Sequence, residues 1–92
     1  MSSIVLNDHN WSLKGNITFK EITTILEQVN HYDWERSITI DFSGVKEIDT
    51  TLISFILEQK RQAKKFGQVI YFKNCPPSLK SLSKLYGIEK FI

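Results

Sequence analysis

The chain has 92 residues, of which 41% are hydrophobic and 24% charged, and its net charge at pH 7 is +2. These values predict one ordinary globular domain, and so small a charge gives no strong attraction to nucleic acid or to an anionic membrane. The single cysteine, Cys75, excludes an internal disulfide and fits a reducing compartment. With no apolar run near the roughly 20 residues that span a bilayer, and no signal pattern, we expect a cytoplasmic protein.

The first third of the chain predicts two strands and a helix. Apolar runs at 4–6 and 11–13 flank the polar segment NDHN, which indicates a hairpin or two neighbouring strands that end at Gly15-Asn16. Thr18 and Glu21 have the spacing of a capping box, with Thr18 as the cap. The helix that follows should span about three turns, because apolar residues recur at helical spacing: Phe19, Ile22, Ile25, Leu26 and Val29.

The remaining elements alternate between strand and helix. Residues 37–42 are β-branched and alternate in polarity, so they predict a strand. A helix is predicted from Thr50 to about Phe66, capped by Asp49 and ended at Gly67. Residues 68–73 form the most hydrophobic strand, which we expect to be central. Pro76-Pro77 then begins a helix over 78–86, closed by Gly87, with four residues facing inward: Leu79, Leu82, Leu85 and Tyr86.

The resulting order is β-β-α-β-α-β-α. Helices between the later strands favour an α/β fold with a mixed sheet and helices packed mainly on one side. No repeat or linker interrupts the pattern, so residues 1–92 are expected to form one domain.

The sequence argues against an enzyme. His9 and His31 lack the spacing of a metal site, and no base is visible that would activate a threonine nucleophile. Gly15 and Gly44 are isolated turn glycines rather than parts of a phosphate-binding loop. We therefore expect no metal, no cofactor and no nucleic acid. The basic residues at 60–65 are interpreted as a solvated helix end that favours the dipole, with an anion site as the alternative.

The helix predicted at 50–66 separates into two faces. Its polar side carries Thr50, Ser54, Arg61 and Lys65, with Thr51, Glu58 and Gln62 beside them. The centre of the apolar side comprises Leu52, Ile56, Ala63 and Phe66. Ile53, Leu57 and Phe55 widen the apolar arc to roughly 200°, beyond the 100° or so that a surface helix needs. Either part of this arc is exposed as a contact surface, or the core wraps around the helix and buries it.

Two hydroxyls begin this helix, and they have two interpretations. Thr50 and Thr51 can satisfy free backbone N–H groups. Alternatively, they form an exposed contact or a phosphorylation point, where a phosphate would add a charge of about −2 beside Asp49.

Four segments resemble the STAS domains, which occur in sulfate transporters and anti-sigma factor antagonists. They cover nearly the whole chain and read WSLKGNIT at 11–18, ITIDFSGVKEIDTT at 38–51, AKKFGQVIYF at 63–72 and LSKLYGIEKFI at 82–92. The second segment is the most specific. The compact length, the strand with Trp11, Thr50 in place of the usual serine, and SLSKLYGI are similar to the small cytoplasmic, MlaB-like STAS subunits of Mla-type phospholipid ABC transporters.

This resemblance implies a non-catalytic adaptor. Such a subunit binds the ATPase subunit of the transporter, supports its assembly and activity, and meets the membrane only through that complex. The contact would use the start of the helix at 50–66, with Thr50 central to it.

The resemblance also implies an alternative, an anti-sigma factor antagonist whose Thr50 is phosphorylated by a partner kinase. The sequence departs from that pattern because Leu52 follows Thr51 where antagonists have glycine, and because Thr18 stands where they have an acid. A third interpretation, a domain that binds nucleotides or lipids, would need a concave pocket that no spacing here predicts.

We therefore predict a docking surface for a partner protein on this helix. Its polar part comprises Asp49, Thr50, Thr51, Ser54 and Glu58, and its apolar anchors are Ile53, Leu57 and Phe55. Glu58 and Arg61 would pair with charges on the partner and orient it. A homodimer formed through the apolar flank is a further possibility.

Overall fold

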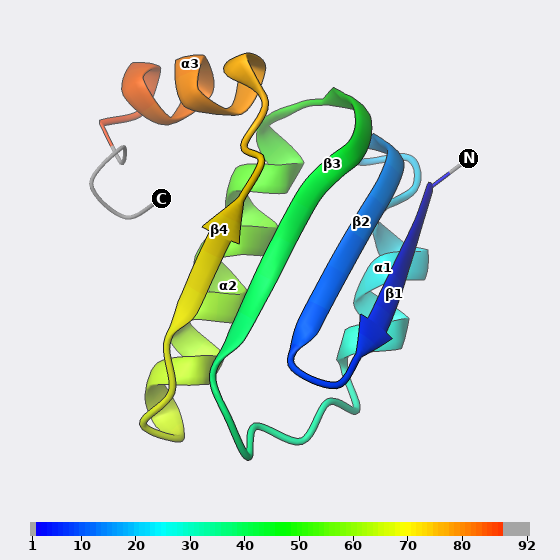
Figure 1. The fold of residues 1–92 in the computed structure, drawn as a ribbon. Coiled ribbons are helices and arrows are strands. Elements are labelled where there is room, and N and C mark those ends of the chain that lie inside the picture. Colours follow the sequence, from blue (N-terminus) through cyan, green and yellow to red (C-terminus); the bar gives the residue numbers. More distant parts are fainter. Residues whose placement is uncertain (1, 88–92) are drawn as a thin grey trace.

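The computed structural model describes residues 2–87, which form a four-stranded mixed sheet and three helices (Figure 1). The strands lie in the order β1-β2-β3-β4; the first pair is antiparallel and the other two pairs are parallel. This confirms the predicted α/β class and element order. The elements are β1 (Ser2–Asn7), β2 (Asn10–Ile17), α1 (Ile22–Val29), β3 (Ile38–Ile48), α2 (Thr50–Lys65), β4 (Ile70–Lys73) and α3 (Pro77–Leu85).

The helices pack on one face of the sheet, as predicted. Figure 1 shows α1 and α2 behind the strands, with α3 at the end of the sheet beyond β4. Side chains of a strand alternate between its two faces, and in β3 Ile38, Ile40 and Phe42 are buried while Thr39 and Asp41 are half-buried. The core therefore lies between the sheet and the helices, and the other face of the sheet meets solvent. Among residues 2–87, no helix is long and apolar enough to cross a membrane.

β3 is longer than the predicted strand at 37–42, and Gly44 lies inside it. The pairing with β2 shifts register twice, between Ser12 and Lys14 and between Gly15 and Asn16. A Cβ atom on Gly44 would lie 2.8 Å from Lys14 Cγ and 3.1 Å from the Leu13 carbonyl oxygen. The glycine is thus required by the close approach of two strands, and the prediction of an isolated turn at this position was wrong.

Among the strands that residues 2–87 form, β4 lies at an edge of the sheet, whereas we had predicted a central position. Only four residues form the strand, and β3 is its neighbour. Its hydrophobic residues are divided between the two faces: Ile70 is buried, but Tyr71 is 60% exposed. Counting apolar residues without assigning them to faces overestimated the burial of this strand.

The start of α1 also differs from the prediction. The helix begins at Ile22, and the residue at its cap position is Glu21, which makes no side-chain capping bond. Thr18 instead accepts the backbone N–H of Ile22 through its carbonyl oxygen, at 3.0 Å, in a turn that precedes the helix. The predicted capping box is therefore absent, and Phe19 lies outside the helix with 70% of its surface exposed. β2 runs on to Ile17, past Gly15-Asn16.

The ends of α2 and the start of α3 confirm the sequence signals. Asp49 caps α2, and Gly67 follows the helix with a φ of +71°. α3 buries Leu79 and Ser83, but Leu85 is 76% exposed, so the prediction that Leu85 and Tyr86 face inward was wrong. The helix packs at the end of the sheet, where only its first two turns have a core to cover. Residues 88–92 of the motif at 82–92 lie outside the described residues.

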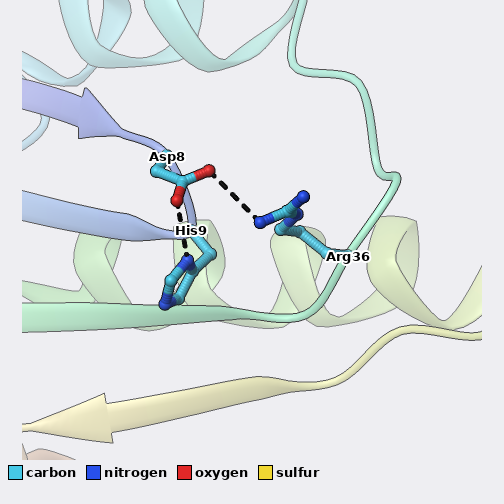
Figure 2. A network of polar contacts seen from close by, with 3 residues as sticks. All are labelled: Asp8, His9 and Arg36. Atoms are coloured by element: carbon cyan, nitrogen blue, oxygen red, sulfur yellow. Dashed lines mark hydrogen bonds and ion pairs between the residues drawn. The ribbon is translucent and has the colours of Figure 1, made fainter.

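The β1–β2 hairpin turn is held by a small polar network (Figure 2). Asp8 has a φ of 57° and joins the strands together with His9. One Asp8 oxygen lies 3.2 Å from His9 Nδ1, and the other accepts a hydrogen bond from Arg36 Nη1 at 3.4 Å. The network ties the hairpin to the segment before β3, which gives His9 a structural position.

Candidate functional site: the N-terminal end of helix α2

Asp49 joins two segments that lie far apart in the sequence. Its Oδ1 accepts a hydrogen bond from the Thr51 backbone N–H at 2.8 Å, which caps α2 as predicted. Its Oδ2 accepts the backbone N–H of Phe19 at 3.1 Å, from the turn between β2 and α1. One carboxylate therefore positions both the first turn of α2 and the exposed Phe19 beside it.

The hydrogen bonds also stabilise the charge on Asp49. Burial alone would raise the pKa of its carboxyl group, but the bonds from Phe19 and Thr51 outweigh burial, and the pKa lies below its ordinary value. Asp49 thus carries a negative charge at the positive end of the helix dipole. Since both oxygens already accept N–H groups, the carboxylate is occupied as a structural acceptor rather than placed as a base for Thr50.

The predicted polar residues are distributed along one side of α2. Thr50 and Ser54 are exposed, one helical turn apart, and Thr51 and Glu58 are half-buried beside them. Leu57 continues this side toward the C-terminal half of the helix and is 39% exposed. The structure therefore places the hydroxyls of Thr50 and Ser54 on one continuous exposed side of α2. The carboxylate of Asp49 lies at the N-terminal end of this side.

Two of the three predicted apolar anchors belong to the core. Ile53 is 6% exposed and Phe55 is 3% exposed, so neither offers a side chain to a partner. The apolar arc of α2 is wide because the rest of the domain buries the helix over a broad part of its circumference, which also includes Gln59 and Ala63. Of the apolar set, Leu57 alone projects from this part of the surface.

Glu58 and Arg61 are paired with each other. Arg61 donates two hydrogen bonds to the Glu58 carboxylate, at 3.0 Å and 2.8 Å, and Gln62 donates a third at 2.8 Å. The hydrogen bonds from Arg61 and Gln62 hold the pKa of Glu58 below its ordinary value. A partner that used either charge would have to compete with this exposed pair, which is worth little in free energy.

Phe19 is the site residue that sequence reasoning missed. A hollow of about 430 Å³ adjoins it and is lined by Asn16, Thr18, Phe19, Lys20, Glu21, Glu47 and Asp49. The helical spacing of the apolar residues had placed Phe19 inward on α1. Its true position follows from the turn at Thr18 and the hydrogen bond to Asp49, and neither has a signature in the sequence.

The start of α2 thus combines exposed hydroxyls, one carboxylate and one exposed aromatic ring. Among the residues that the structure describes, no cluster of three His, Cys, Asp or Glu side chains is arranged to hold a metal ion. A four-stranded mixed sheet with helices on one face, and an acid followed by hydroxyls at the start of the second helix, define the class of STAS domains.

Comparison with known proteins gives the family. The profile of the family described as "Mlab, STAS domain" matches residues 4–92, and the chain belongs to this family. No curated protein matches the chain. A solved structure entitled "Crystal Structure Analysis of Mglu" is similar in fold, with a TM-score of 0.61 and 18% identity over 82% of this chain. The chain spans 19% of the length of that protein, and at this identity the likeness concerns the fold alone.

Proposed function

We propose that the domain is a non-catalytic adaptor that binds the ATPase subunit of an Mla-type phospholipid ABC transporter and supports its assembly and activity. The observation that carries this proposal is the geometry at the start of α2. Asp49 accepts the backbone N–H groups of Thr51 and Phe19, and so holds exposed Phe19 at the end of the helix that begins with exposed Thr50. Membership of the family described as "Mlab, STAS domain" supports the choice of partner. The adaptor would reside in the cytoplasm and reach the inner membrane through its partner.

The contact would occupy what we call the α2 docking surface: Asp49, Thr50, Thr51, Ser54, Leu57 and Phe19. Phe19 replaces the buried Ile53 as the apolar anchor. A large aromatic ring with polar groups around it has the composition typical of residues that dominate binding energy at protein interfaces. Thr50 lies between Asp49 and Ser54 on this surface, so a larger charged side chain there would prevent close approach of the partner.

The test is recovery of partners from native cells by the tagged protein, followed by binding measurements with the purified partner. We expect an ATPase and its permease to be recovered, and Thr50→Glu to weaken ATPase binding at least about tenfold. Gln28→Glu is the matched control, because Gln28 is exposed near the far end of α1 and the charge change is the same. Equal affinities for a folded Thr50→Glu variant and the wild type would remove Thr50 from the interface.

The exposure of Thr50 supports a second candidate, an anti-sigma factor antagonist that a partner kinase phosphorylates at Thr50. In that function only the unmodified domain would bind. Recovery of a kinase-like partner together with phosphate on Thr50 would replace the transporter proposal with this one.

A further inference from the structure

A groove lies between α1 and the C-terminal half of α2, on the helix side of the sheet. Figure 1 shows α1 behind β1 and β2, and α2 behind β3 and β4. The groove has a volume of about 530 Å³, which falls in the range of ligand-binding clefts. We call it the interhelix groove, and six of its lining residues concern us here: Leu26, Glu27, Tyr32, Trp34, Gln59 and Phe66.

Gln59 places an unpaired amide in this groove. The residue is 5% exposed, and its side chain makes no hydrogen bond with any residue that the structure describes. Its amide atoms are not fully enclosed by protein, so the amide faces the groove that Gln59 lines. Buried polar side chains in native proteins nearly always have a hydrogen-bond partner. A ligand in the groove can supply the partner that the described residues do not.

The charge of the lining is negative. Glu27 is exposed on α1 and has no ion pair with a described residue. Glu58 also lines the groove, but its carboxylate already accepts hydrogen bonds from Arg61 and Gln62. The described lining residues include no lysine, arginine or histidine. Glu27 is therefore the charge that remains available, and it favours a cation.

Aromatic and aliphatic side chains complete the groove. Buried Trp34 and half-buried Tyr32 pack edge to face, with ring centres 5.1 Å apart. Leu26 is 38% exposed and Phe66 is 60% exposed. Aromatic rings attract cations through the negative potential of their faces. The groove thus combines an apolar lining with one free carboxylate and one unpaired amide.

We propose that the interhelix groove binds a small organic cation, in which an amidinium, guanidinium or ammonium group is attached to an apolar body. The N–H groups of the cation would donate to the Glu27 carboxylate and to the Gln59 amide oxygen. The apolar body would pack against Tyr32, Trp34 and Phe66. The inference goes beyond the proposed adaptor function, because the groove shares no residue with the α2 docking surface.

Charge, polarity and length favour this ligand over others. A phosphate group, on a nucleotide or on a lipid, would meet carboxylates of its own sign. A wholly apolar ligand would cover the Gln59 amide and leave it without a partner, which is costly. From Glu58 to Phe66 the groove extends roughly 12 Å along α2. This length suits a small molecule better than a stable protein interface, which buries roughly 800 Å² on each partner.

The test is a titration of the 15N-labelled full chain with benzamidine, benzamide and benzoate. These three compounds have nearly the same shape, and they are cationic, neutral and anionic. NMR spectra follow the side-chain amide of Gln59 and the indole N–H of Trp34. We expect benzamidine to shift both signals in a saturable way, benzamide to bind at least about fivefold more weakly, and benzoate to leave both signals in place.

Two substitutions test the polar groups separately. Glu27→Gln should weaken benzamidine binding about fivefold and leave benzamide binding unchanged. Glu47→Gln makes the same charge change on an exposed residue of β3 and should have no effect. Gln59→Leu should weaken binding of both compounds while the melting temperature stays equal or rises, because an apolar side chain of similar size replaces an unpaired amide.

Any of three results would overturn the inference. The first is the absence of saturable shifts at Gln59 and Trp34, and the second is equal affinity for benzamidine and benzoate. The third is a benzamidine affinity that Glu27→Gln leaves unchanged, since this exposed substitution does not put folding at risk. Thr50→Glu separates the inference from the proposed function, because it should weaken ATPase docking and leave benzamidine binding intact. Failure of one proposal therefore does not imply failure of the other.

Discussion

The backbone N–H of Phe19 donates a hydrogen bond to Asp49, 30 residues later in the chain, at 3.1 Å. This bond fastens the turn before α1 to the start of α2. Loss of this bond should therefore lower the stability of the fold.

Replacing Asp49 by alanine removes the acceptor of two backbone N–H groups. We expect Asp49→Ala to lower the free energy of unfolding by about 2 kcal/mol, the sum of a lost helix cap and a second lost hydrogen bond. Urea denaturation measures the change. Asp33→Ala is the control, because Asp33 is exposed and should tolerate the substitution within about 0.5 kcal/mol. Equal effects of the two substitutions would contradict the structural role of Asp49.

The lowered pKa of Asp49 predicts a dependence of stability on pH. A carboxyl group whose pKa is lower in the folded state stabilises the fold above its unfolded value, near 3.8, and this stabilisation is lost as the pH falls through the folded value. Asp49→Asn should therefore show a smaller loss of stability than the wild type between pH 5 and pH 2. Urea midpoints across this range measure it, and parallel curves for the two proteins would show that Asp49 does not contribute.

Gly44 tests the close approach of β2 and β3. A methyl group at Gly44 meets Lys14 Cγ and the Leu13 carbonyl oxygen, so Gly44→Ala should destabilise the fold by about 1–3 kcal/mol. Lys14→Ala in the same chain removes the nearer of these contacts and should restore part of the stability. Thermal unfolding of the single and double variants checks both statements. Simple additivity of the two substitutions would argue against the contact.

A substitution at Phe19 tests partner binding at the α2 docking surface separately from the stability of the fold. Its ring is 70% exposed, so Phe19→Ala should change the free energy of unfolding by no more than about 0.5 kcal/mol. We expect the same substitution to weaken binding to the ATPase by at least about tenfold. Phe66→Ala is the matched control, since Phe66 is 60% exposed beyond the other end of α2. Similar affinities for both variants would exclude Phe19 as an anchor.

Ile53 and Leu57 lie on the same helix, but the first is buried in the core and the second is exposed. Ile53→Ala creates a cavity beneath α2 and should cost about 2–4 kcal/mol, whereas Leu57→Ala should cost less than about 1 kcal/mol. Chemical denaturation of the two variants gives the comparison. A larger loss for Leu57→Ala would mean that the assignment of faces on α2 is wrong.

Local signals in the sequence were sufficient for the fold class, the cap at Asp49 and the end of α2 at Gly67. These features depend on neighbouring residues, and the structure confirms them. The edge position of β4 depends on which strand it pairs with, and the exposure of Leu85 depends on how far the core extends under α3. Both are properties of the assembled layers, which a periodic pattern does not contain.

The same distinction applies to the candidate site. Asp49, Thr50 and Ser54 could be predicted because they share a helix start and a helix face. Phe19 could not, since it reaches the site through a hydrogen bond between distant segments. Ile53 was misplaced because a helical wheel shows the direction of a side chain, but it does not show how much protein covers that direction.

If a partner binds the α2 docking surface as proposed, the bond between Phe19 and Asp49 would make that binding depend on complete folding of the domain. Helix α2 can be capped by Asp49 in a chain whose N-terminal third is still unfolded, and such a chain would display Thr50 and Ser54. It would lack the ring of Phe19, which reaches its place only when β2 is in the sheet and the turn at Thr18 has formed. A partner that requires all three residues would thus select completed domains and leave partly folded ones to the cell's proteases.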